Sequence, residues 1–182
     1  MDYFLLNWIQ GFTPKSWDWF FSWFSVLGRF EIISFFIVLF LWFGYKNIFK
    51  VYIGFFWYFM GLVLEFLSKT MFHHPPPPIV LNRTLNVFNL PSINIESDFS
   101  FPSGHVYRMT FLALISNFYF LKTKNYLGII VTWIVFIIMV YSRVSLAEHW
   151  PSDVIGGIIL AFFMLRLTFS SVNNFLRHNF IH

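Results

Sequence analysis

The residues best suited to chemistry fall into two short stretches of this sequence. The first stretch, residues 101–105, reads Phe-Pro-Ser-Gly-His and stands directly before a long apolar run, so a helix is expected to begin at Ser103 and Gly104. The start of a helix offers unpaired backbone N–H groups and the positive end of the helix dipole, which together suit a phosphate. His105 would project from the first turn beside that anion. The stretch therefore predicts a phosphate site with a histidine next to it.

The second stretch adds an arginine, a histidine and an aspartate, which are Arg143, His149 and Asp153. A guanidinium group is a planar fork that can bind two phosphate oxygens at once. His149 and Asp153 are four residues apart, so on a helical turn they share a face, where the carboxylate can hold the imidazole by its N–H. Together with the first stretch, these residues predict phosphoryl chemistry at a membrane surface.

Together the two stretches resemble the type 2 phosphatidic acid phosphatase family, whose members share a fold with vanadium haloperoxidases. That family carries three motifs: a Lys followed after six residues by Arg-Pro, then Pro-Ser-Gly-His, then Ser-Arg, five residues, His, three residues and Asp. The second and third motifs match in full at residues 102–105 and 142–153. The first motif matches in part, because Lys69 is present but Pro76 stands at the position of the Arg.

The resemblance implies a role for each matching residue. His149 would be the nucleophile that forms a phosphohistidine, with Asp153 fixing its tautomer, and His105 would protonate the leaving oxygen and later activate water. The residues that it assigns to the phosphate oxygens are Lys69, Ser103, Gly104 and Arg143. Fixed cations would take the place of a metal ion, so neither a metal nor a cofactor is expected.

Several residues could replace the missing arginine of the first motif. Arg108 is the first candidate, because it lies three residues beyond His105 on the same helix face, and an arginine inside a membrane helix needs an anionic partner. Alternatively, its side chain snorkels to the lipid headgroups. Arg83 is the second candidate. His73 and His74 could contribute only when protonated, and the rival interpretation of this pair is a metal site.

The composition indicates a membrane protein of one domain. The chain has 182 residues, of which 58% are hydrophobic and 11% charged, whereas soluble domains have about 25% charged residues. Aromatic residues make up 24%, which suits a lipid-facing surface with interfacial belts. The net charge of +4 comes from basic residues scattered between apolar runs, which favours topology signals over nucleic-acid binding. The absence of cysteine excludes disulfides and thiol chemistry.

Long apolar runs predict an all-α bundle of five transmembrane helices within a single domain, residues 1–182. The runs cover residues 30–44, 51–71, 103–121, 126–141 and 153–172. A short loop between the last two is expected to hold the third motif. Residues 3–27 are interrupted by glycine, proline and charged residues and contain four tryptophans, which predicts one or two helices at the membrane interface. A sixth span that starts near Trp17 stays open.

Two further features bear on the site. Residues 72–102 form the one long polar segment, and the four prolines at 75–78 predict a stiff, extended start. This segment either caps the active site and selects the substrate or is a flexible connector. Glu65 precedes Lys69 by four residues within the second span, a spacing that permits a helical ion pair. Glu65 then either neutralises Lys69 or takes a direct part in catalysis.

The distribution of charge predicts the topology. The turns at residues 45–50 and 122–125 and the C-terminal tail would share one side of the membrane in a five-span arrangement. They carry five basic residues and no acidic ones, namely Lys46, Lys50, Lys122, Lys124 and Arg177. Because positive charge marks the cytoplasmic side, all three motifs are expected to face the extracytoplasmic side of a cell membrane or inner membrane.

The resemblance thus implies an integral-membrane phosphatase that removes a phosphate from a lipid monoester or diphosphate. The substrates it allows are polyprenyl diphosphate, phosphatidylglycerophosphate, phosphatidic acid and lipid A 1-phosphate. A phosphotransferase that passes the same phosphohistidine to another lipid is one alternative. A non-catalytic lipid-phosphate binder or transporter is another, favoured by the lost arginine of the first motif. A vanadate-dependent oxidase is related by fold, but nothing in the sequence favours it. The sequence leaves the oligomeric state open.

Overall fold

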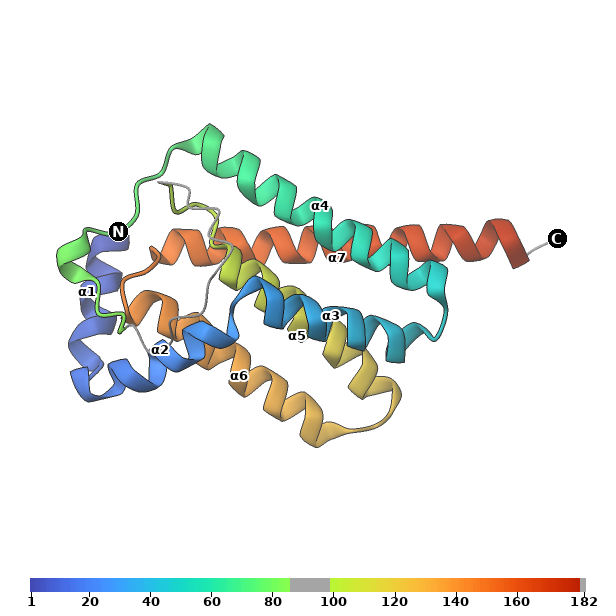
Figure 1. Ribbon diagram of the computed structural model, residues 1–182, viewed down its shortest axis with the longest axis horizontal. Coiled ribbons are helices and arrows are strands. Elements are labelled where there is room, and N and C mark those ends of the chain that lie inside the picture. The colour runs from blue at the N-terminus through green and yellow to red at the C-terminus, as the bar shows by residue number, and fades with distance from the viewer. Residues whose placement is uncertain (86–98, 181–182) are drawn as a thin grey trace.

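The computed structural model describes residues 1–85 and 99–180, and this part of the chain is a helical bundle without strands (Figure 1). The elements in chain order are α1 (Asp2–Phe12), the 3-10 helix η1 (Lys15–Trp17), α2 (Asp18–Leu27), α3 (Phe30–Tyr45), α4 (Ile48–Phe72), the 3-10 helix η2 (Ile79–Leu81), α5 (Gly104–Lys122), α6 (Tyr126–Ser145) and α7 (Pro151–Phe180). The predicted all-α class is confirmed, and the five predicted apolar runs correspond to α3 through α7.

Helix α5 lies at the centre of the bundle, in contact with α3, α6 and α7 (Figure 1). Its first turns carry His105 and Arg108, and Thr110 and Ser116 further along are buried. Polar side chains are costly in contact with lipid, so they are best placed on a helix that its neighbours surround. The interior position of α5 therefore allows it to bring polar chemistry into the bundle.

In the described part of the chain, three helices are long and apolar enough to cross a membrane, namely α4, α6 and residues Pro151–Asn174 of α7. The pair formed by Lys15–Leu27 and Phe30–Tyr45 makes a fourth if it is counted as one span with a bend of 56°. Helix α5 is not among them, because its polar residues lower its hydropathy. The predicted count of five to six spans is therefore not established by length and composition.

Two tyrosines join α3, α4 and α5 in the core. Tyr58 and Tyr107 are fully buried and stacked, with ring centroids 6.0 Å apart. The Tyr107 hydroxyl donates to the Tyr58 backbone oxygen at 2.7 Å, and the Tyr58 hydroxyl shares a 2.8 Å hydrogen bond with Ser34 on α3. Buried hydroxyls with partners avoid the cost of unpaired polar groups. These contacts hold the start of α5 at a defined position against α4.

The N-terminal helices lie across the end of the bundle where α6 ends and α7 begins (Figure 1). Gln10 donates to the backbone oxygens of Leu81 and Ser145, both at 3.0 Å. Thr13 shares a 2.6 Å hydrogen bond with Tyr141 on α6. The N-terminal segment thus ties the chain that follows α4 to the end of α6. The placement of these helices at a membrane interface stays a prediction.

The opposite end of the bundle carries the basic turns. The α3–α4 and α5–α6 connections both lie there, away from α1 and α2 (Figure 1). Lys122 donates to the backbone oxygen of Gly44 at 3.1 Å and so links the two turns. This arrangement matches the charge asymmetry read from the sequence, with the three motifs at one end and the lysine-bearing turns at the other.

Arg83, the second candidate for the missing arginine, lies against the N-terminal helices. Its guanidinium forms an ion pair with Asp18 at 2.7 Å and donates to the backbone oxygens of Gln10 and Thr13. These contacts hold the side chain against the N-terminal helices, so the structure favours Arg108 over Arg83 as the replacement, and the role of Arg83 stays a prediction. Residues 86–98 of the predicted capping segment lie outside the described residues.

Candidate active site

The start of α5 is built as the sequence predicts. Ser103 is fully buried and caps the helix, with its hydroxyl accepting from the backbone N–H of Val106 at 3.5 Å. The backbone N–H of Ser103 donates to the backbone oxygen of Asp153 at 3.0 Å. This bond joins the second motif directly to the third, although 50 residues separate the two positions along the chain.

The third motif spans two helices rather than a loop alone. Arg143 lies in the last turns of α6, which continues to Ser145, and His149 lies in the connection before α7. The predicted short loop is therefore confined to residues 146–150. The backbone N–H groups of Glu148 and His149 donate to the Arg143 oxygen at 3.0 and 3.2 Å. They satisfy a carbonyl that the helix end would leave unpaired.

His149 and Asp153 face each other across the start of α7. The distance from Nδ1 of His149 to Oδ2 of Asp153 is 3.5 Å, which is longer than an ordinary hydrogen bond. The backbone N–H of Trp150 donates to the same oxygen at 2.9 Å. Catalytic hydrogen bonds are often long before substrate binds. The predicted pairing is thus present, but it forms at a helix start and not on a continuous helical turn.

Arg143 is held by a carboxylate that the sequence analysis did not single out. Its side chain is 1% exposed, and Nη1 forms an ion pair with Glu148. Glu148 also accepts from the hydroxyls of Thr84 at 2.7 Å and Ser25 at 3.4 Å. Within the described residues, Nε and Nη2 of Arg143 have no hydrogen-bond partner. Two donors of a buried cation are thus left for an oxyanion.

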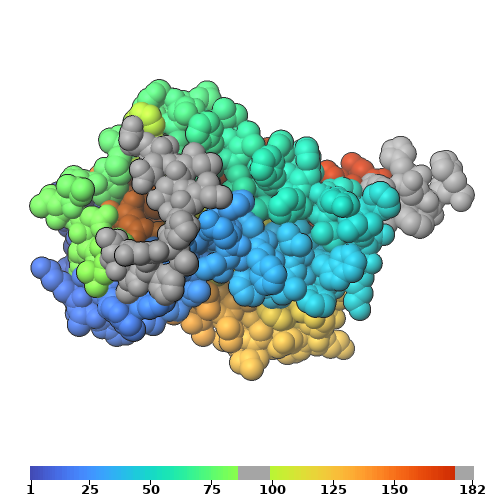
Figure 2. Space-filling model, in the orientation of Figure 1, coloured from blue at the N-terminus to red at the C-terminus, as the bar shows by residue number. Residues whose placement is uncertain are grey.

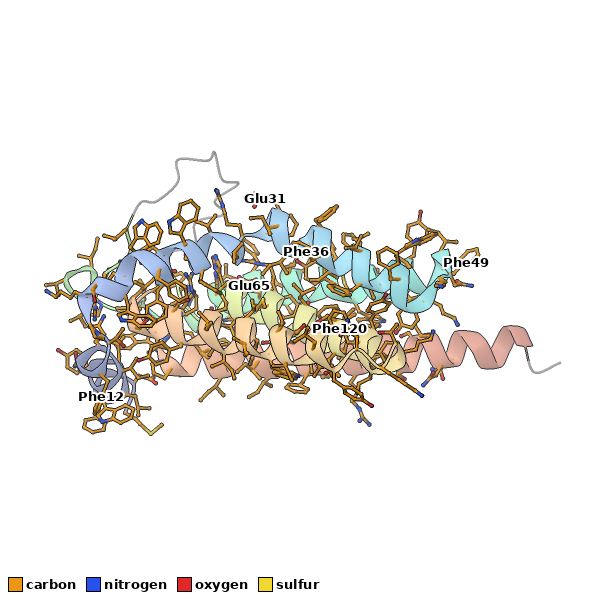
Figure 3. All side chains as sticks on the ribbon, turned by 90° about the horizontal axis from the view of Figure 1, so that it is seen from below. Phe12, Glu31, Phe36, Phe49, Glu65 and Phe120 are labelled. Carbon is orange, nitrogen blue, oxygen red and sulfur yellow. The ribbon has the colours of Figure 1, made fainter. Side chains whose placement is uncertain are left out.

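Lys69 and Arg108 meet at one carboxylate, that of Glu65. The Lys69 ammonium lies 3.1 Å from Glu65 Oε1, and Nη1 of Arg108 lies 3.8 Å from Oε2. Figure 3 shows Glu65 inside the bundle. A Cβ at residue 104 would come within 2.0 Å of Glu65 Oε1, so a side chain there would force the Glu65 carboxylate to shift. The first candidate for the missing arginine thus lies beside Lys69 and the helix start, and its side chain is only 12% exposed, so it does not snorkel.

His105 is the remaining predicted catalytic residue of this site. Its ring passes so close to Gly28, at the bend between α2 and α3, that a Cβ at residue 28 would come within 2.6 Å of the His105 Cδ2 atom. The charged and titratable groups within electrostatic range of His105 are Arg143, Arg108, His149 and Lys69. The structure therefore brings the predicted residues from α4, α5, α6 and α7 together at one end of the bundle.

Three of the candidate site residues, Arg108, Arg143 and Asp153, have partners that the sequence analysis did not assign. Glu65 pairs with Arg108 as well as with Lys69, Glu148 holds Arg143, and His74 lies 3.1 Å from Asp153. Only the pair of Glu65 and Lys69 has a local spacing that a sequence can signal. The other contacts join residues of different elements.

The arrangement suits an oxyanion. Three cations converge, and two of them have nitrogens without a hydrogen-bond partner in the described part of the chain, namely Arg108 Nε and Arg143 Nε and Nη2. Such fixed donors are what phosphoryl transfer needs around the phosphate. Among the described residues, no group of three or more His, Asp or Glu side chains is arranged to hold a metal ion. His73 and His74 belong to no such group within this part of the chain.

An apolar groove runs beside the site between α4 and α7, with a volume of about 240 Å³. The residues that line it are Ser68, Phe101, Pro102, Gly156, Ile159, Leu160 and Phe163. Phe101 and Pro102 directly precede the helix start at Ser103, and Ser68 directly precedes Lys69. In Figure 2, orange atoms of the α6–α7 region are visible between the blue N-terminal part and the green segment after α4.

The comparisons with known proteins agree with this geometry. A family model described as PAP2 superfamily matches residues 50–177. Phosphatidylglycerophosphatase B of Bacillus subtilis (strain 168) is 34% identical over 80 residues, and this match spans 39% of each of the two chains. A crystal structure of a transmembrane PAP2 type phosphatidylglycerolphosphate phosphatase from Bacillus subtilis is also similar. The match spans 95% of this chain and 85% of the chain in that crystal structure, with a TM-score of 0.70 and 19% identity. At that identity the likeness shows the fold.

Proposed function

The chain belongs to the PAP2 superfamily, and on that premise we propose that it is an integral-membrane lipid phosphatase acting through a phosphohistidine at His149. The observation that carries the proposal is the convergence of His149 and its aspartate with His105 and three cations. Arg108, which pairs with Glu65 beside Lys69, is the cation proposed to replace the arginine that the first motif lacks. A protein of this fold that had lost catalysis and only bound lipid phosphates would not need to keep both histidines, the aspartate and the three cations.

The proposed reaction has two steps. In the first, Nε2 of His149 attacks phosphorus in line while His105 gives a proton to the leaving oxygen, so that the P–O bond breaks and a P–N bond forms. Asp153 holds the Nδ1 proton and stabilises the charged imidazole. In the second, His105 removes a proton from water, which attacks the phosphohistidine and releases phosphate. The free enzyme is then restored.

The phosphate oxygens would be held by fixed positive groups throughout both steps. Lys69, Arg108 and Arg143 supply side-chain donors, and the backbone at Ser103 and Gly104 supplies the helix start. These groups are in place before the reaction, so little reorganisation accompanies the transfer of charge. We propose that the reaction needs no metal ion.

The groove between α4 and α7 supports a lipid as the substrate. It is lined mainly by apolar side chains and begins beside the helix start that would hold the phosphate. Phosphatidylglycerophosphate is the first substrate to test, because the name of the Bacillus relative specifies it. Polyprenyl diphosphate, phosphatidic acid and lipid A 1-phosphate are the other substrates of the proposal.

We propose five spans, α3 through α7, with α1 and α2 at the interface of the extracytoplasmic side. Sheltering by its neighbours would let α5 cross the membrane despite its polar residues. Exposed Trp8, Trp17 and Trp19 on the N-terminal segment support the interfacial placement. The lysine-bearing turns at the other end of the bundle support a cytoplasmic location there. The active site would then face the outer leaflet.

The test is phosphate release from these four lipids by purified protein in detergent with EDTA present. Release that continues in EDTA and is lost in His149→Ala is the expected result. His73→Ala is the matched control, because the His73 ring is exposed and its described hydrogen bond is to the Met71 oxygen. Release that requires an added acceptor lipid would indicate the phosphotransferase. Folded protein that binds these lipids without any release would indicate the binder or transporter.

A further inference from the structure

The carboxylate behind His149 is shared with a second histidine. Asp153 is fully buried, and its Oδ2 atom faces His149 and accepts from the backbone of Trp150. Its Oδ1 atom lies 3.1 Å from Nδ1 of His74. A carboxylate oxygen that is buried needs a donor, and His74 supplies one. The two oxygens of Asp153 thus serve two different imidazoles.

His74 is held in this position by several contacts. Its backbone oxygen accepts from the N–H of Ser100 at 2.8 Å, and the Ser100 hydroxyl lies 3.3 Å from Nδ1 of the ring. The next residue, Pro75, accepts from the indole N–H of Trp150 at 2.8 Å. The segment after α4 is therefore attached to the chain before α5 and to the turn before α7.

The end of α4 separates the two adjacent histidines. His73 caps the helix in the left-handed conformation, with φ of 48° and ψ of 34°, which redirects the chain at that residue. The ring of His73 is exposed against Phe99, whereas the ring of His74 reaches the buried Asp153. A non-glycine residue with positive φ is uncommon. This turn is what brings only the second histidine to the site.

We propose that His74 is a positioning residue for the phosphoryl transfer, a role that rests on the proposed function. With a proton on Nδ1, the ring donates to Oδ1 and fixes the rotation of the Asp153 carboxylate. Oδ2 is then directed at His149, which must keep its own Nδ1 proton while Nε2 attacks. His74 lies two residues before Pro76, which stands at the position of the missing arginine. This part of the first motif therefore still contacts the site, through His74 and Asp153.

The test compares His74→Ala and His74→Asn with the control His73→Ala. For His74→Ala we expect kcat for the preferred lipid phosphate to fall on the order of 10- to 100-fold, as for other residues that orient a catalytic ligand. KM should change less than about twofold, because His74 does not contact the phosphate. The amide nitrogen of Asn can replace Nδ1, so His74→Asn should recover most of the rate. His73→Ala should behave as the unchanged protein.

Vanadate binding gives a readout that does not depend on turnover. Vanadate can bond to the nucleophilic nitrogen as an analogue of the transition state, whereas inorganic phosphate binds through the cations alone. His74→Ala should weaken vanadate binding about tenfold, measured by tryptophan fluorescence, and leave phosphate binding unchanged. Equal effects on both anions, or a rate loss with lowered thermal stability that His74→Asn does not restore, would overturn the inference.

These experiments distinguish a failure of the proposed function from a failure of the inference about His74. If the unchanged protein releases no phosphate from any lipid, the proposed function fails, and the comparison of vanadate with phosphate still decides the role of His74. If the unchanged protein is active and His74→Ala matches His73→Ala in kcat and in vanadate binding, the inference about His74 is refuted while the proposed function stands.

Discussion

Arg108→Ala tests how the site manages without the arginine of the first motif. The guanidinium is 12% exposed, pairs with Glu65 at 3.8 Å, and keeps Nε without a hydrogen-bond partner among the described residues. Lys69 lies nearer to Glu65, at 3.1 Å. Truncation of Arg108 therefore does not leave Glu65 without a cation, and we expect the variant to fold.

The size of the effect follows from the hydrogen bonds that are lost. A hydrogen bond to a charged group contributes roughly 1.5–3 kcal/mol, and each 1.4 kcal/mol corresponds to about a tenfold change. If Arg108 donates one such bond to the phosphate in the transition state, Arg108→Ala should lower kcat/KM about 10- to 140-fold. Arg108→Lys keeps the charge but loses the planar fork, so its loss should be intermediate.

The assay is phosphate release from the preferred lipid in detergent, with kcat and KM determined separately. Arg166→Ala is the matched control, because Arg166 also lies on a membrane helix but its side chain is exposed. Its kcat/KM should stay within about twofold of the unchanged protein, since it lies outside the cation cluster.

Two results would refute this reasoning. The first is a kcat/KM for Arg108→Ala that equals that of the Arg166→Ala control. The second comes from the double variant with Glu65→Gln. If Arg108 served only to neutralise Glu65, removal of the Glu65 charge would abolish the effect of Arg108→Ala. A loss that persists at similar size in the Glu65→Gln background supports direct contact with the phosphate.

Two further predictions concern residues that surround the catalytic groups. Gly28→Ala would place a Cβ 2.6 Å from the His105 ring, so the ring must shift and kcat should fall about tenfold or more; unchanged kcat in the phosphate-release assay would contradict this contact. Glu148→Gln removes the charge that pairs with Arg143, which is 1% exposed, and should cost on the order of 1–3 kcal/mol of stability. Thermal unfolding in detergent measures this loss of stability. Glu31→Gln is the control, because the Glu31 carboxylate is exposed (Figure 3). Equal unfolding midpoints for the two variants would show that the ion pair of Glu148 with Arg143 does not stabilise the protein.

The positions of the helices follow from local sequence properties. Long apolar runs predicted where α3 through α7 begin to within about three residues, because a run of that length has few other stable structures in a membrane. Helices α6 and α7 continue past their predicted ends at residues 141 and 172, to Ser145 and Phe180. The helix start at Ser103 was predictable for the same kind of reason, since a serine before an apolar run is a usual cap. The motif residues were found by their types and spacing and by the resemblance of that spacing to a known family.

The partners of those residues could not be predicted in the same way. Glu65 and Lys69 are one helical turn apart, so their pairing was visible from spacing. Arg83 and Asp18 are 65 residues apart, and their contact depends on how the N-terminal helices cross the bundle. The sequence therefore offered Arg83 as a second candidate for the phosphate, and only the fold showed its ion pair with Asp18.

The sequence by itself determined the helical class and the set of candidate catalytic residues, because local apolar runs and fixed spacings encode both. Only the tertiary structure decided which charges meet. It brought Arg108 to Lys69 through Glu65, gave the buried Arg143 a carboxylate partner in Glu148, and placed His74 against Asp153. Such pairs form between different helices and loops, where the distance between two side chains is set by the crossing of whole elements and not by their separation along the chain.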